Sequence, residues 1–164
     1  MKVSKRRRIE AKTDYAKRIK LLKSEKPRLV FRRTNKYIIA QYVVSENAQD
    51  KIVKGISSLE LLKYSWPTDM TGSLKSITAS YLTGYLMGKR IIKEKMETPI
   101  MDFGMIKMIH KTKTFAFLNG AIDAGLKIEC KKEAFPEKDR ISGKNLKKDF
   151  SKTFETIKSK IDKE

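Results

Sequence analysis

Residues 27–44 constrain the fold of this chain more than any other stretch. Two runs that favour β-strands, 29–31 and 37–44, flank a short turn that contains Thr34 and Asn35. Two such runs around a short turn are typical of an antiparallel β-hairpin. The turn region 32–36 also carries three positive charges. The sequence therefore predicts a hairpin whose legs join a hydrophobic core and whose tip faces a polyanion.

The excess of positive charge is concentrated before residue 37. The chain has 38 Lys and Arg against 19 Asp and Glu, a formal net charge of +19. Residues 1–36 hold 15 of the basic residues and 3 of the acidic ones. Such a field implies an anionic partner, nucleic acid first and an anionic membrane surface second. A lysine-rich but unspecialised protein would not gather its charge in the first fifth of the chain.

Cysteine usage and hydropathy indicate a cytoplasmic protein. The single cysteine, Cys130, excludes an internal disulfide and fits a reducing compartment. We find no early apolar run that resembles a signal peptide, and no stretch of about 18 apolar residues that could span a bilayer. We therefore expect no membrane partner.

The N-terminal half is expected to form an arm, a helix and three strands. Residues 1–11 are too charged to fold alone and are expected to form an arm. A short basic helix is expected over 13–22, with Thr13 or Asp14 as its N-cap. After the hairpin, a polar loop over 45–50 leads to a third strand over 51–57. One or two helical turns over 58–64 then precede a loop, 65–73, which holds Trp66.

A long helix over 74–95 carries small residues at intervals of four. Ser80, Gly84 and Gly88 form this stripe. Each interior glycine costs about 1 kcal/mol relative to alanine, so the stripe needs a packing reason. We expect it to lie against a neighbouring element at short distance in a soluble core.

The C-terminal half continues with further segments. A strand over 99–104 is short and apolar enough to be central in a sheet. A helix over 114–124 should end at Gly125. An edge strand over 127–130 and a polar linker over 133–143 follow. Last comes an amphipathic helix that must dock on this domain or on a partner. Its apolar seam consists of Leu146, Phe150, Phe154, Ile157 and Ile161.

The element order β-β-β-α-β-α predicts an α/β fold, with a mixed sheet and helices packed on it. This order resembles the ribonuclease H-like motif, here with a basic N-terminal arm and a helical C-terminal tail. We divide the chain into a basic arm with its short helix (1–26), an α/β RNA-binding core (27–130), and a linker with the C-terminal helix (131–164).

The residues for catalysis are missing. One Cys and one His, 20 residues apart, cannot build a metal site, and His110 lies in a lysine-rich loop that would not support an imidazolium. Ribonuclease H-like nucleases hold two metal ions with several carboxylates, one of them on the first strand. Here the first strand has no acid, and Asp102 is the single carboxylate on a buried strand. We expect no enzyme, cofactor, metal or small-molecule substrate, and a structural role for Asp102 as an acceptor of hydrogen bonds from a neighbouring loop.

Several motifs resemble one family in order and spacing. They are KRRRIEAKTDYAKRIKLLKSEKPRLVFRRTNKYIIAQ, SYLTGYLMGKR, NGAIDAGLKI and FPEKDRISGKNL, which together run from about Lys5 to Lys148. They resemble the archaeal and eukaryotic form of the large-subunit ribosomal protein numbered eighteen. The resemblance implies a structural constituent of the large ribosomal subunit with a ribonuclease H-like fold that lacks catalytic residues. It also implies partners: 5S rRNA, the large-subunit rRNA to which it helps attach 5S rRNA, and neighbouring proteins of the central protuberance.

Three groups of residues are expected to contact RNA. Arm cations would follow phosphates, hairpin-tip arginines would bind them bidentately, and Asn35 would meet a base edge or a 2′-hydroxyl. Tyrosines would stack on unpaired bases, and family resemblance marks the KTKTF loop as facing RNA. The residues are Lys5, Arg6, Arg7, Arg8, Lys12, Tyr15 and Arg18; Arg32, Arg33, Asn35, Lys36 and Tyr37; and Lys107, Lys111 and Lys113. Packing roles stay open for both tyrosines, Tyr37 as a cross-strand residue and Tyr15 as a contact between its helix and the domain.

Two other classes of function stay open at this point. A metal-dependent ribonuclease H-like nuclease would cleave an RNA–DNA hybrid in the presence of magnesium. A non-ribosomal basic protein would bind RNA outside the ribosome, or would bind anionic vesicles as well as it binds RNA.

Overall fold

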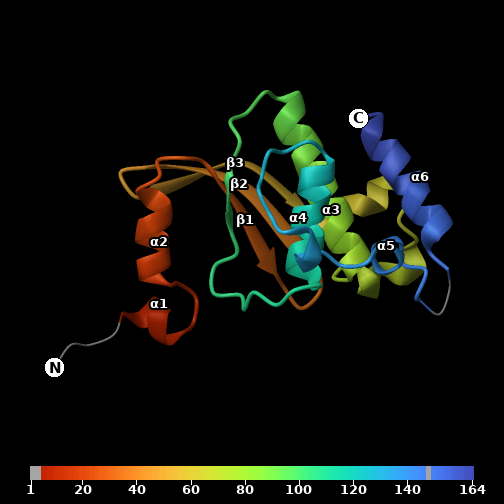
Figure 1. Ribbon diagram of the computed structural model, residues 1–164, viewed down its shortest axis with the longest axis horizontal. Coiled ribbons are helices and arrows are strands. Elements are labelled where there is room, and N and C mark those ends of the chain that lie inside the picture. Colours follow the sequence, from red (N-terminus) through yellow and green to blue (C-terminus); the bar gives the residue numbers. More distant parts are fainter. Residues whose placement is uncertain (1–4, 147–148) are drawn as a thin grey trace.

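The computed structural model describes residues 5–146 and 149–164 of the protein (Figure 1). Four strands form one mixed sheet in the order β3-β2-β1-β4. The strands are β1 (Arg28–Arg33), β2 (Ile38–Glu46), β3 (Gln49–Ser57) and β4 (Ile100–Asp102). β1 pairs antiparallel with β2 and parallel with β4, which confirms the expected mixed sheet with helices against it. Residues 1–4 of the expected arm and residues 147–148 of the expected tail lie outside the described residues.

The predicted hairpin is confirmed, and its turn is closed by Thr34. The Thr34 amide donates to the Tyr37 carbonyl at 2.9 Å, and the Tyr37 amide donates to Thr34 Oγ1 at 3.0 Å. Successive residues of a strand alternate between the two faces of a sheet. Leu29, Phe31 and Ile38 are therefore fully buried in the main core. Arg28, Val30 and Arg32 of β1 face the other side of the sheet. We call this second side the open face.

The predicted polar loop over 45–50 is wrong, because β2 and β3 are joined by a two-residue turn. Asn47 and Ala48 have φ of 48° and 63°. Two consecutive residues in the left-handed region match the twist of the flanking strands, as type I′ hairpin turns do. The strands therefore extend to Glu46 and start again at Gln49, two residues earlier than expected.

Two expectations about the sheet are corrected. β4 lies at one edge of the sheet rather than in its centre. It has only three residues and pairs with β1, and of these three residues only Asp102 is buried. Residues 127–130 form no strand, because the Ile128 amide bonds locally to the Leu126 carbonyl at 3.0 Å.

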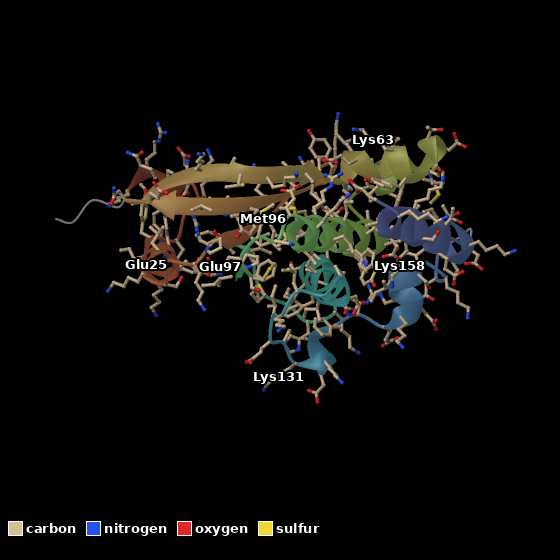
Figure 2. All side chains as sticks on the ribbon, turned by 90° about the horizontal axis from the view of Figure 1, so that it is seen from above. Glu25, Lys63, Met96, Glu97, Lys131 and Lys158 are labelled. Atoms are coloured by element: carbon tan, nitrogen blue, oxygen red, sulfur yellow. The ribbon has the colours of Figure 1, made fainter. Side chains whose placement is uncertain are left out.

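α3 (Ile77–Lys93) and α4 (Lys113–Asp123) lie together on one side of the sheet (Figure 2). Their close approach confirms the packing role of the small-residue stripe. A Cβ built at Gly84 would lie 2.1 Å from the Phe117 carbonyl oxygen, and one at Gly120 would lie 2.1 Å from the Tyr81 carbonyl oxygen. α4 also ends as predicted, with Gly125 at φ 112°.

The C-terminal helix α6 (Ser151–Asp162) docks on this domain and completes its core. Phe154, Ile157 and Ile161 are buried, and the Phe154 ring lies 5.5 Å from that of Tyr81 on α3. Leu146, by contrast, lies outside the helix and is exposed. The expected linker over 133–143 is wrong, because the segment contains η3 (Lys132–Ala134) and α5 (Lys138–Ser142) and buries Ala134 and Ile141.

The N-terminal segment is partly helical. α2 (Tyr15–Leu22) starts as predicted, with Asp14 accepting from the amides of Ala16 and Lys17. The arm was expected to be too charged to fold alone, but its described part contains one helical turn, α1 (Arg6–Ile9). The predicted helical turns form η1 (Ser58–Tyr64), and η2 (Thr68–Ser73) lies within the predicted loop. No helix of the described residues is both long and apolar enough to cross a bilayer.

Candidate RNA-binding surface

Three cations from separate elements meet beside the hairpin tip. They are Arg33 at the end of β1, Lys75 before α3, and Lys113 at the start of α4, and we call them the tip patch. Burial and the positive charges of Arg33 and Lys75 lower the pKa of Lys113. Lys75 Nζ also donates to the Asn35 carbonyl oxygen at 2.8 Å, which ties the turn to the start of α3. The patch therefore presents concentrated positive charge on rigid elements.

The other hairpin residues predicted to contact RNA differ in exposure and in the face of the sheet on which they lie. Lys36 and Asn35 are exposed at the turn, and Tyr37 is half-buried beside it. Arg32 faces the open side of the sheet, away from Arg33, because neighbouring residues of a strand alternate. Its guanidinium donates to the carbonyl oxygens of Phe31 and Asp102, at 2.8 and 3.1 Å. Arg32 is thus held by the protein itself as well as being partly exposed.

A buried ion-pair network lies at the base of the open face. Arg28, only 3% exposed, donates to Asp102 at 3.0 Å and to Asp50 at 2.7 Å. Asp102 also accepts from the Gly104 amide at 2.8 Å, which confirms its predicted role as an acceptor for the neighbouring loop. Burial opposes ionisation of Asp50, but hydrogen bonds from Arg18, Ser45 and Arg28 outweigh it and lower the pKa of Asp50 to about 2.

The arm cations are exposed, and several of them are bound locally. Lys5 Nζ lies 4.6 Å from the centre of the Tyr15 ring. Arg8 pairs with Asp14 at 3.2 Å, and Arg7 Nε donates to the Thr13 hydroxyl at 3.0 Å. Arg6 and Lys12 both pair with Glu10, at 3.5 and 2.8 Å. Arg18 pairs with Asp50 at 2.8 Å and so anchors α2 to the β2–β3 hairpin.

The predicted patch of Lys107, Lys111 and Lys113 is divided by the structure. Lys113 joins the tip patch, whereas exposed Lys111 pairs with Glu137 at 3.3 Å. Lys107 remains exposed in the loop that follows β4. His110 in the same loop packs edge-on against Phe115, with ring centres 5.4 Å apart.

Sequence reasoning did not single out Lys75, Arg28 or Lys17 as site residues. Lys75 joins the tip patch only because the start of α3 lies beside the hairpin turn. Lys17 reaches the Gly104 carbonyl at 3.3 Å, 87 positions away in the chain. No local pattern marks such residues, since their roles depend on tertiary contacts.

The arrangement suits recognition of a polyanion. Guanidinium and ammonium groups bind phosphates, while an exposed amide and half-buried tyrosines can meet unpaired bases. In the described residues, no three His, Cys, Asp or Glu side chains gather in a group that could hold a metal ion.

Comparisons with known proteins show which family the chain resembles. A family model described as "Ribosomal large subunit proteins 60S L5, and 50S L18" matches residues 1–100. A protein of Korarchaeum cryptofilum named large ribosomal subunit protein uL18 is 42% identical over 88% of this chain and 72% of its own length. The uL18 proteins of Methanoregula boonei and Methanothermobacter thermautotrophicus are 36% and 38% identical. Those alignments cover 99% and 98% of this chain, and 94% and 88% of the two relatives.

These matches extend over most of the chain and confirm the family resemblance and the expectation of a non-enzymatic protein. The chain belongs to the family of the large-subunit ribosomal proteins 60S L5 and 50S L18, and is a structural component of the large ribosomal subunit.

Proposed function

We propose that this protein binds 5S rRNA and helps to attach it to the large-subunit rRNA in the central protuberance, beside neighbouring large-subunit proteins. The observation that carries this proposal is the tip patch. Both charged groups that lower the pKa of Lys113 are themselves positive, so the free protein holds a repulsion that a phosphate would relieve.

The tip patch and the arm would make different kinds of contact with the RNA. Arg33 ends a strand, Lys113 begins a helix and Lys75 lies two residues before another helix, so they would set the position of the RNA. The arm cations are exposed and would add phosphate contacts with release of counterions. Asn35, Tyr37 and Tyr15 would supply the base and ribose contacts that separate one RNA from another.

We also propose the ribonuclease H-like motif, without its catalytic carboxylates, as the finer description of the fold. In this proposal residues 27–130 carry RNA recognition. Residues 1–26 extend the basic surface. Residues 131–164 complete the hydrophobic core through the packing of α6.

The first test is binding of the full chain to 5S rRNA and to an unrelated structured RNA of equal length, over a series of salt concentrations. We expect a preference for 5S rRNA that survives physiological salt, since shape recognition is less dependent on salt than phosphate attraction. Equal binding of both RNAs, lost steeply with salt, would contradict the proposal.

A charge-matched pair of variants tests the tip patch. The triple variant Arg33→Gln, Lys75→Gln, Lys113→Gln should lose at least about tenfold in affinity for 5S rRNA, and its salt slope should fall by about 2 to 3. The control triple Lys152→Gln, Lys160→Gln, Lys163→Gln removes the same charge from exposed positions at the C-terminal end. Equal losses in both variants, with unchanged circular dichroism, would show that only net charge matters.

A further inference from the structure

The open face of the sheet forms the floor of a cavity of about 280 Å³. α2 and the segment before it form one wall, and the β2–β3 hairpin closes the far end. Its apolar lining consists of Leu21, Val30, Val43 and Ile52, and Gln41 stands among them on β2. The size is near the lower limit of small-molecule sites, at about 300 Å³, and suits one flat heterocycle.

The residues that line the cavity carry a net positive charge. Its three carboxylates, Asp14, Asp50 and Asp102, are all paired with arginines. Lys17, which also lines the cavity, reaches only the carbonyl oxygen of Gly104 among its described contacts. Arg28 is 3% exposed, yet its Nε has no hydrogen-bond partner in the described residues. An unpaired buried donor of this kind is costly to the folded state. The excess of positive charge in the cavity wall favours a ligand that carries negative charge.

A second hollow adjoins the first along shared residues. It measures about 400 Å³, is open to solvent, and has Phe103, Met105 and Ile106 in its lining. Arg7, Lys12 and Arg32 line both hollows and form a basic ridge between them. Two partly apolar hollows on either side of three cations match a nucleotide chain, in which a phosphate separates neighbouring bases.

We propose that an unpaired segment of RNA crosses this ridge, with a phosphate on Arg7, Lys12 and Arg32 and one base inserted in the cavity. The inference rests on the proposed function and names a second contact for the same RNA, away from the tip patch. Ile52, which is 54% exposed, contacts the face of the base. The Gln41 side chain meets its edge, since an amide can donate and accept at once.

The first experiment asks whether a base enters the cavity. Four short RNA oligonucleotides carry a single base each, A, C, G or U, among abasic residues, and a fifth is wholly abasic. We expect the full chain to bind one of the four about tenfold more tightly than the abasic strand, and Gln41→Leu to remove that preference. If all four bind like the abasic strand, the proposal is overturned.

The second experiment uses neighbouring residues of β3. Ile52 and Val53 are 54% and 49% exposed, but only Ile52 lines the cavity. Ile52→Glu and Val53→Glu make the same charge change on the same strand, at positions exposed enough to leave the fold intact. We expect Ile52→Glu to weaken 5S rRNA binding about tenfold more than Val53→Glu does.

The outcomes separate this inference from the function on which it rests. Equal losses from the two glutamate variants overturn the cavity site, while a preference of the unaltered protein for 5S rRNA keeps the proposed function. Loss of that preference overturns the proposed function, and the single-base oligonucleotides then still decide whether the cavity takes a base.

Discussion

Asp50 is the residue on which three elements depend, because it accepts hydrogen bonds from Arg18 of α2, Arg28 of β1 and Ser45 of β2. Its pKa is lowered to about 2 from an ordinary value of 3.8. A carboxyl whose pKa falls on folding stabilises the folded state above its unfolded pKa. That stabilisation is lost as the pH falls through about 2.

We therefore expect Asp50→Asn to lower the free energy of unfolding by about 1–3 kcal/mol at neutral pH. The difference from the unaltered protein should shrink as the pH falls from 3.8 towards about 2. Urea unfolding at several pH values measures it. Asp69→Asn, in the exposed η2 segment, is the control and should change little. A difference that does not depend on pH would contradict the role given to the Asp50 carboxylate.

At the scale of elements, the crossing of α3 and α4 depends on the absence of a Cβ. Alanine at Gly84 would place its methyl group 2.1 Å from the Phe117 carbonyl oxygen. We expect Gly84→Ala to destabilise the protein by about 1–3 kcal/mol, although alanine favours a helix by about 1 kcal/mol over glycine. Thermal unfolding measures the change. Gly72→Ala, where a Cβ meets nothing within 4 Å, should be nearly neutral.

The elements themselves were largely predictable, because periodicity and turn chemistry are local. The hairpin, α2 with its Asp14 cap, and α3 with its small-residue stripe all follow from short patterns. The place of β4 in the sheet does not, since strand order is decided by long-range pairing. Residues 127–130 have the composition of a strand, yet turn locally instead of pairing with the sheet.

The sequence allowed us to predict that the candidate site is basic, but not which basic residues lie together in it. A basic hairpin tip is visible in the sequence, but its neighbours Lys75 and Lys113 are brought there by the helices of the core. Arg32 and Arg33 are adjacent in sequence and look equivalent, yet the pleat of β1 sends them to opposite faces. The charge pattern of the sequence therefore predicts the class of ligand, a polyanion. Which cations share one contact surface can be known only from the fold.

For the whole molecule, the net charge of +19 should make salt act in opposite directions on folding and on RNA binding. Between about 20 and 300 mM NaCl, screening should raise the melting temperature of the free protein while it lowers affinity for RNA. Differential scanning fluorimetry measures the first effect. In the variant Lys152→Glu, Lys163→Glu, whose net charge is +15, the rise should be smaller. A melting temperature that falls with salt would mean that ion pairs such as Arg28–Asp102 outweigh the repulsion.

The single tryptophan provides an optical probe of one end of the molecule. Trp66 is buried, its ring lies 4.8 Å from that of Phe150 just before α6, and its Nε1 donates to the Met70 carbonyl at 3.2 Å. α6 lies at the opposite end of the molecule from α1 and α2 (Figure 1). Release of the C-terminal segment would hydrate the indole and shift its emission to longer wavelength, without any added dye. RNA bound in the cavity beside α2 would leave the spectrum unchanged, so one measurement distinguishes release of the C-terminal segment from occupancy of that cavity.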